Sequence, residues 1–186
     1  MVKYQNYIIT EENGKIRIRN ARKGINGGMC ANLGRTSMIG FNLESADLSY
    51  TDLTGVDFGS TNLMRASLFK AILSGVDLRD LFMIEADLGY SDLSNANMSG
   101  ARLNRASLIR AKLCNADLSC ADLSFSNLRN ADLTGANLRN ADLTGADLKY
   151  ADLTGADLKY ADLSCVDLSY TNLTGVDLSN TKLDWR

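Results

Sequence analysis

The sequence predicts an all-β fold in which the chain coils as a solenoid, and three observations lead to this prediction. Leucine recurs at every fifth position, as in ADLTGADLKYADLTGADLKYADLSC at 141–165. A period of five fits neither the 3.6-residue helix nor the flat strand with its period of two. The chain contains no proline, which is expected of a backbone that is hydrogen-bonded in ladders along most of its length.

The repeat runs without insertion from Leu33 to Leu183 and comprises 31 units. Its leucine position holds leucine in 27 units, and the others hold Met38, Phe58, Met83 and Met98. The small position, two residues earlier, holds Ala, Thr, Val or Ser except at Phe41 and Leu81. Between them, the polar position is Asp or Asn in 23 units, and two turn positions follow the leucine. We expect the leucine and small positions to face inward and the other three to face water.

A bend must recur in every unit, because two inward residues in every five cannot continue along a straight strand. The Asp, Asn, Ser, Thr and Gly outside the inward columns are turn-forming residues. The chain must therefore coil, with successive coils about 4.8 Å apart through inter-strand hydrogen bonds. The period of five alone does not fix the number of sides in a coil.

The unbroken tandem A-(D/N)-L-x-x of residues 31–183 resembles the pentapeptide-repeat proteins. This resemblance implies a right-handed quadrilateral β-helix, with four units in a coil and about eight coils in all. The uninterrupted form is similar to many cyanobacterial members. Other members resemble DNA in shape and charge and inhibit or protect DNA gyrase, which confers quinolone resistance. None of the familiar members is an enzyme.

Residues 1–30 precede the β-helix of residues 31–186 and depart from the repeat. Tyr7 and Ile9 alternate with other residues, Asn13-Gly14 favours a turn, and Ile16 and Ile18 resume the alternation. We interpret this segment as a β-hairpin that caps the first coil, because the end of a solenoid exposes apolar columns and unpaired backbone. Its six basic and two acidic residues leave a partner surface as the alternative.

No group of residues predicts catalysis, a cofactor or a metal. The chain has no histidine, and its aspartates repeat without distinction along the polar position. The cysteines, which we expect to be reduced thiols, follow no zinc-ligand spacing; they are Cys30, Cys114, Cys120 and Cys165. The chain shows no signal peptide and no membrane-spanning run, so we expect a cytoplasmic protein without a membrane partner.

Outward apolar residues break the pattern mainly between 64 and 109. Folding the sequence on a twenty-residue coil brings these residues together with cations, a composition that protein interfaces favour. The predicted partner patch comprises Met64, Arg65, Phe69, Lys70, Phe82, Ile84, Tyr90, Arg102, Arg105, Ile109 and Arg110. Two alternatives are a local bulge at Leu81 that turns Phe82 inward and a scatter of apolar residues without function.

Charge is divided along the chain. Residues 1–112 carry 14 basic and 11 acidic groups, and residues 113–186 carry 6 and 11. The aspartates of the C-terminal part are spaced as a phosphate-like ladder that Arg129, Arg139, Lys149 and Lys159 interrupt. We therefore hold two hypotheses: a non-catalytic scaffold that binds an unidentified protein, and a DNA-mimicking binder of gyrase. Direct nucleic-acid binding is not expected.

The C-terminal coil is a second candidate contact. It exposes a leucine layer and open backbone groups, which pair with other chains unless they are blocked. We predict a homodimer about a two-fold axis through Leu168, Leu173, Leu178, Leu183 and Trp185. The alternative is a monomer in which this coil frays or Trp185 and Arg186 fold back over it.

Overall fold

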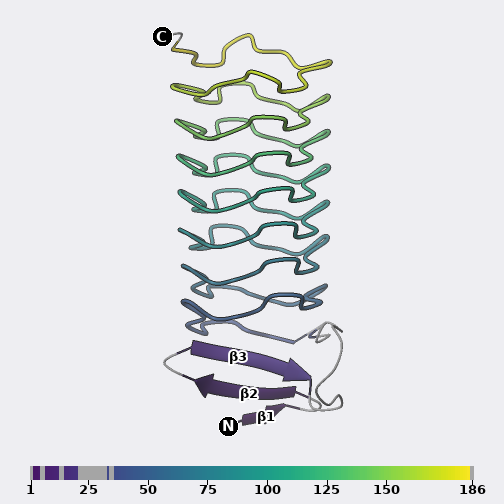
Figure 1. Ribbon diagram of the computed structural model, residues 1–186, viewed down its shortest axis with the longest axis vertical. Coiled ribbons are helices and arrows are strands. Elements are labelled where there is room, and N and C mark those ends of the chain that lie inside the picture. The colour runs from purple at the N-terminus through teal and green to yellow at the C-terminus, as the bar shows by residue number, and fades with distance from the viewer. Residues whose placement is uncertain (1, 5–6, 13–14, 21–32, 34–35, 185–186) are drawn as a thin grey trace.

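The computed structural model describes the chain except for residues 1, 5–6, 13–14, 21–32, 34–35 and 185–186. Three short strands come first: β1 (Val2–Tyr4), β2 (Tyr7–Glu12) and β3 (Lys15–Asn20). From residue 36 onward the chain winds as a stack of coils, and the three strands lie at the N-terminal end of this stack (Figure 1). The described residues form no helix, in agreement with the predicted all-β class.

The three strands form one antiparallel sheet in the order β1-β2-β3. Strands β2 and β3 pair along their whole length, with Ile9 opposite Ile18. The strand pairing of the predicted hairpin is therefore present, and its turn at 13–14 lies outside the described residues. Strand β1 pairs with the other edge of β2, with Val2 opposite Ile9, and the sequence analysis did not predict it.

Each coil of the stack takes twenty residues. Parallel bridges join residues that are twenty apart, such as Phe82 with Arg102 and Arg102 with Asp122. Twenty residues hold four five-residue units, so the coil has the four sides that were expected. Between coils, Leu103 N–H donates to Asp122 O at 2.7 Å, and Asp122 N–H donates to Ala101 O at 2.9 Å. These short parallel ladders satisfy the backbone groups on every side of the stack.

The leucine and small positions point into the coils and form one continuous core. Every leucine position from Leu48 to Leu158 has 0% exposure. Hydroxyls also occur at the small position: Thr61 Oγ1 donates to Met38 O at 2.6 Å, whereas the buried Ser126 Oγ has no hydrogen-bond partner among the described residues. Phe41 is an exception to the inward column, because it is 49% exposed.

The corner between two sides is a four-residue turn closed by a backbone hydrogen bond. Ala106 N–H, for example, donates to Leu103 O at 2.9 Å. In the described units from Gly40 to Asn180 the second turn position has a positive φ, with values of 55–65° for the non-glycine residues; at one corner Gly59 takes the positive φ instead. Glycine and asparagine recur at this position because they adopt the left-handed region at low cost.

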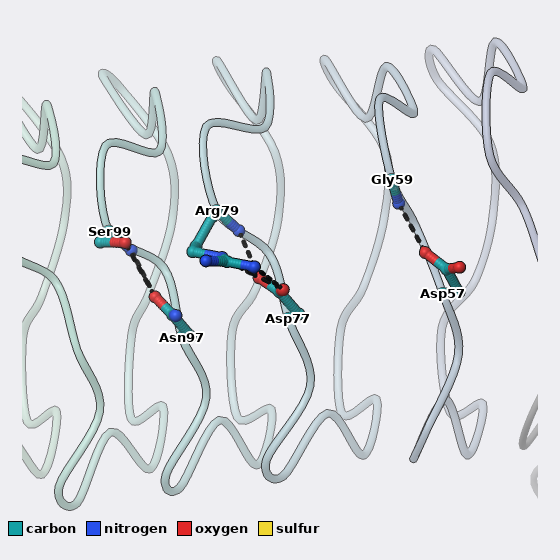
Figure 2. A network of polar contacts seen from close by, with 6 residues as sticks. All are labelled: Asp57, Gly59, Asp77, Arg79, Asn97 and Ser99. Carbon is teal, nitrogen blue, oxygen red and sulfur yellow. Dashed lines mark hydrogen bonds and ion pairs between the residues drawn. The ribbon is translucent and has the colours of Figure 1, made fainter.

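Aspartate and asparagine at the polar position hold the next corner in place. Their Oδ1 accepts a hydrogen bond from the backbone N–H two residues later, which makes an Asx turn. Figure 2 shows three of these bonds on successive coils, at 3.1–3.2 Å, which join Asp57 to Gly59, Asp77 to Arg79 and Asn97 to Ser99. The polar position therefore favours a short side chain with an acceptor oxygen, which explains why Asp and Asn predominate there.

A larger side chain at the small position should destabilise the coils. Ala136 has 0% exposure, so Ala136→Leu adds methyl groups to a closed column, and overpacking of this kind costs about 1–3 kcal/mol. Thr54 occupies an exposed turn position, so Thr54→Leu adds the same side chain outside the core. Denaturant unfolding compares the two variants, and equal free energies of unfolding would contradict the inward assignment of the small position.

Loss of one Asx bond should weaken the coils by less. Asp142 Oδ1 accepts a hydrogen bond from Thr144 N–H at 2.9 Å. Asp142→Ala removes this acceptor and should lower the free energy of unfolding by about 0.5–1.5 kcal/mol. Asp142→Asn keeps an acceptor oxygen and should stay within about 0.5 kcal/mol of the unaltered chain. Thermal denaturation measures both, and an equal loss in the two variants would show that the negative charge matters and the turn acceptor does not.

Candidate partner interface

Exposed apolar side chains occur along the whole stack, from Ile39 to Tyr170, and two of them belong to the predicted partner patch. Phe82 and Tyr90 are 43% and 44% exposed, although most positions equivalent to theirs hold polar residues or glycine. The half-buried apolar members of the partner patch are Met64, Phe69, Ile84 and Ile109. Their exposed surface lies on coils that are stacked directly on one another, because residues twenty apart share a column.

Phe82 points outward. Its large neighbour Leu81 is 3% exposed and packs inside the core. Phe82 keeps parallel bridges to Asn62 below and Arg102 above, as the twenty-residue register predicts. The alternative of a local bulge that turns Phe82 inward is therefore wrong, because the core accommodates Leu81 without breaking the ladder. The guanidinium carbon of Arg102 lies 4.8 Å from the centroid of the Phe82 ring.

Two adjoining columns of the patch combine aromatic rings with cations. Phe69 makes edge contacts with Tyr50 and Tyr90, with ring centroids 5.7 and 5.4 Å apart. Lys70 Nζ lies 5.4 Å from the Tyr50 and Phe69 centroids and 5.7 Å from the Tyr90 centroid. The guanidinium of Arg110 lies 5.7 Å from the Tyr90 centroid. The cation–π contacts place both cations against rings and join the two columns into one cluster.

Tyr50 belongs to this cluster and is absent from the predicted patch. It is 50% exposed and stands twenty residues before Lys70 and forty before Tyr90. The twenty-residue spacing was the signal that would have identified it. The prediction did not include Tyr50 because it was based on apolar residues at positions that are usually polar. Tyrosine is common at the second turn position, so Tyr50 did not stand out.

The cations of the patch differ in their ionic partners. Arg65 pairs with Glu44 at 3.3 Å and with Glu85 at 3.0 Å, so its charge is balanced by the stack itself. Within the described part of the chain, no carboxylate forms an ion pair with the other four, which are Lys70, Arg102, Arg105 and Arg110. The patch therefore presents several cations whose charge remains available.

Four cations of the C-terminal part are paired with aspartates one coil away. These ion pairs span 2.9–3.1 Å and join Arg129 to Asp147, Arg139 to Asp157, Lys149 to Asp167 and Lys182 to Asp162. The backbone N–H of Lys159 and then the Arg139 guanidinium lower the pKa of Asp157. Aspartates of the predicted phosphate-like ladder thus form turns and ion pairs. Arg129, Arg139 and Lys149 interrupt the ladder and also balance the charge of three of its aspartates.

Cys114 is a protonated thiol at neutral pH. Its Sγ donates a hydrogen bond to Asp132 Oδ2 at 3.0 Å. Burial, and then the contact with Asp132, raises the pKa of this thiol to about 11. The described cysteines Cys114, Cys120 and Cys165 are free, and Cys30 lies outside the described residues. Among the described residues, no group of three or more His, Cys, Asp or Glu is arranged to hold a metal ion.

The C-terminal coil has a partly open leucine layer. The leucines of the predicted dimer contact are half-buried, whereas their counterparts in the middle of the stack are fully buried; they are Leu168, Leu173, Leu178 and Leu183. Trp185, the other member of that contact, lies outside the described residues. The homodimer stays a prediction. The described chain contains no helix with the length and apolar character needed to cross a membrane.

Comparisons with known proteins agree with the repeat. A family model of pentapeptide repeats matches in eight copies, over residues 29–63, 52–80, 83–119, 121–159 and 161–184. The chain is similar to the solved structure of HetL, a pentapeptide repeat protein involved in heterocyst differentiation regulation from the cyanobacterium Nostoc sp. strain PCC 7120. The two share 31% identity over 82% of this chain and 86% of that one, with a TM-score of 0.41.

Two further solved structures are similar. A pentapeptide repeat protein of the Arabidopsis thaliana thylakoid lumen shares 35% identity over 57% of this chain and 68% of its own, with a TM-score of 0.45. QnrB1, a plasmid-mediated fluoroquinolone resistance protein, shares 22% identity over 83% of this chain and 90% of its own, with a TM-score of 0.34. The comparison with curated proteins finds no match.

From residue 36 to 184 the match falls on the part of the chain that winds into coils. The family model spans most of the chain, and its unit has the same five-residue length as the inward columns and corner turns described above. The chain therefore belongs to the pentapeptide-repeat family and has the right-handed β-helical fold of that family.

Proposed function

We propose that this protein is a non-catalytic scaffold that binds a protein partner through the partner patch. One observation supports this above the others: exposed rings and cations without ionic partners share the same stacked coils. Aromatic residues and arginine are enriched at protein interfaces and supply most of their hot spots. Elsewhere on the described stack the cations are largely paired and the polar position is mostly Asp or Asn.

Rigid backbone supports the patch and favours binding over catalysis. Phe82 is held between two bridged neighbours, and the Phe69 ring is fixed between Tyr50 and Tyr90. A surface of this kind loses little conformational entropy when a partner docks. The stack interior is filled by leucine, so the patch offers a broad surface in place of a deep substrate cavity.

The ends of the stack complete the proposal. We infer that the β1–β3 sheet caps the N-terminal coil, since it lies at that end of the stack (Figure 1). With four units to a coil, the 31 units correspond to about eight coils. Such a rod holds the patch at a fixed place along its length, which suits a scaffold that positions a partner.

A DNA-mimicking binder of gyrase is the alternative function. It draws on the acidic excess of residues 113–186, with 11 acidic and 6 basic groups, and on QnrB1 as a similar protein. The ion pairs of Arg129, Arg139 and Lys149 weigh against it, because they balance aspartates that a phosphate mimic would leave free.

A supercoiling assay separates the two functions. We expect micromolar protein neither to inhibit DNA gyrase nor to protect it from a quinolone. If either effect appears with the unaltered protein, the gyrase hypothesis replaces the scaffold. A control protein with Asp122, Asp132 and Asp142 changed to Asn tests whether such an effect depends on the acidic columns.

Changes in the patch should release the partner. Phe82→Asp together with Ile84→Asp places two negative charges among apolar side chains, and the loss of hot-spot contacts should reduce partner recovery at least about ten-fold. The measurement is quantitative affinity capture from the native host, with the purified proteins as bait. Tyr160→Asp together with Tyr170→Asp is the matched control, because these rings are 58% and 75% exposed outside the patch. An unchanged partner set with the first variant would refute the patch.

A further inference from the structure

We propose that the partner binds through a segment rich in carboxylates, which contacts Arg102, Arg105 and Arg110. These three arginines belong to one coil of the partner patch, and we call them the arginine row. The inference rests on the proposed function and adds the chemistry of the partner to it. It follows from three features: the local sequence, the hydrogen bonds and ion pairs of the neighbouring carboxylates, and the rings beneath two of the arginines.

The sequence around the row is more basic than the rest of the repeat. Residues 101–113, ARLNRASLIRAKL, contain four cations and no Asp or Glu. Three consecutive polar positions hold Arg102, Ser107 and Lys112, where the repeat otherwise favours Asp or Asn. This coil therefore lacks the acidic side chains that its neighbours present, and its outward surface is basic on adjoining sides.

The carboxylates on adjacent coils are already bonded to other groups. Asp122, the bridge partner of Arg102, accepts hydrogen bonds from Ser124 N–H at 3.0 Å and from Ser124 Oγ at 2.6 Å. Glu85, one coil below Arg105, pairs with Arg65 at 3.0 Å. The arginine row thus remains without ionic partners among the described residues: Asp122 bonds to Ser124, and Glu85 pairs with Arg65.

No carboxylate occupies the column of Arg110. Residues twenty below and twenty above it are Tyr90 and Asn130. Tyr90 provides a ring at 5.7 Å from the guanidinium carbon but no negative charge. Arg110 therefore has no ionic partner in its own column, and it forms no ion pair with the described carboxylates of neighbouring columns.

Rings hold two of the arginines ready for a carboxylate. Arg102 lies over Phe82 at 4.8 Å, and Arg110 lies over Tyr90 at 5.7 Å. A guanidinium above a ring uses its flat face, and its N–H donors stay in the guanidinium plane, where they can bind a carboxylate with two hydrogen bonds. Ordering the side chain in advance reduces the entropy that binding would cost.

Carboxylates of a protein fit the row better than nucleic acid does. Nucleic-acid affinity grows with the number of phosphates that cations neutralise, and the row occupies a single coil about 4.8 Å deep. The 113–186 part, directly beyond it, carries 11 acidic and 6 basic groups and would repel a long phosphate backbone. A second copy of this chain fits less well, because aspartates such as Asp147 and Asp157 are already paired with Arg129 and Arg139.

Peptide selection tests this proposal without a known partner. The full chain is immobilised, short random peptides displayed on phage are selected on it, and the affinities of the enriched peptides are measured by fluorescence anisotropy. We expect enriched peptides to carry several Asp or Glu, and their affinity to fall as salt is raised. A variant with Arg102→Gln, Arg105→Asn and Arg110→Asn should bind them at least about ten-fold more weakly. Asparagine suits the last two positions because Asn95 and Asn115 adopt the same positive φ.

The matched control removes three positive charges from ion-paired sites. Arg79→Gln, Arg129→Gln and Arg139→Gln changes cations that pair with Asp77, Asp147 and Asp157, and two of these arginines also lie near tyrosine rings. This variant should keep the affinity of the selected peptides within about three-fold. Circular dichroism melts of both variants check that the stack is intact.

Several outcomes would overturn the proposal. These are a selection without binders, enriched peptides without an acidic excess, and an equal loss in the control variant. Tighter binding of a labelled DNA or RNA oligonucleotide, lost in the arginine-row variant, would assign the row to nucleic acid; binding of labelled protein of the same sequence would assign it to self-association. If Phe82→Asp with Ile84→Asp releases the native partner but the arginine-row variant does not, the proposed function stands and the acidic partner is refuted.

Discussion

The parallel ladder between coils is the interaction on which the rest of the structure depends. It joins each residue to the one twenty positions later, and through this register it aligns every side chain with its counterparts above and below. The leucine column is closed because the ladder places leucine on leucine, and the corners are fixed because the ladder leaves only the turn positions free to bend. A single backbone constraint therefore sets both the core and the pattern of the surface.

The surface follows from this constraint in a particular way. A side chain at an outward position meets residues of its own column and of the adjoining columns on the coils above and below, so its ionic state depends on those neighbours. Arg129 finds Asp147 near it and is neutralised, whereas Arg110 finds Tyr90 and Asn130 in its column and is not. The partner patch arises where several columns at once lack the usual acidic or small residue.

The sequence contained most of the fold because the five-residue period is unbroken. It predicted the inward columns, the coiling of the chain and the outward place of Phe82 between Asn62 and Arg102. The four-sided coil required the family resemblance, since several closures satisfy a period of five. The fate of Leu81 was left open because sequence does not reveal whether a core column has room for a larger residue, and the structure places it inside.

The pairing of side chains was harder to predict from the sequence than the register of the backbone. The pairing of Arg65 with Glu44 and Glu85, and the bond from Cys114 to Asp132, depend on rotamers that residue spacing does not determine. Tyr50 is different, because the twenty-residue spacing places it in the column of Lys70 and Tyr90, and only its ring contact with Phe69 crosses to the next column. The ionic balance of the surface therefore required atomic positions.

The twenty-residue register has a consequence for insertions and deletions. Removal of twenty residues takes out one whole coil and leaves every later column on the same side of the rod. Removal of a single five-residue unit keeps each inward residue inward but rotates everything beyond it by one side, a quarter turn around the axis. Phe82 and Arg102 would then no longer share a column if the deletion fell between them. A change in length by a multiple of twenty residues therefore preserves each face of the rod. A change by five, ten or fifteen residues keeps the core filled but moves the later side chains to different faces.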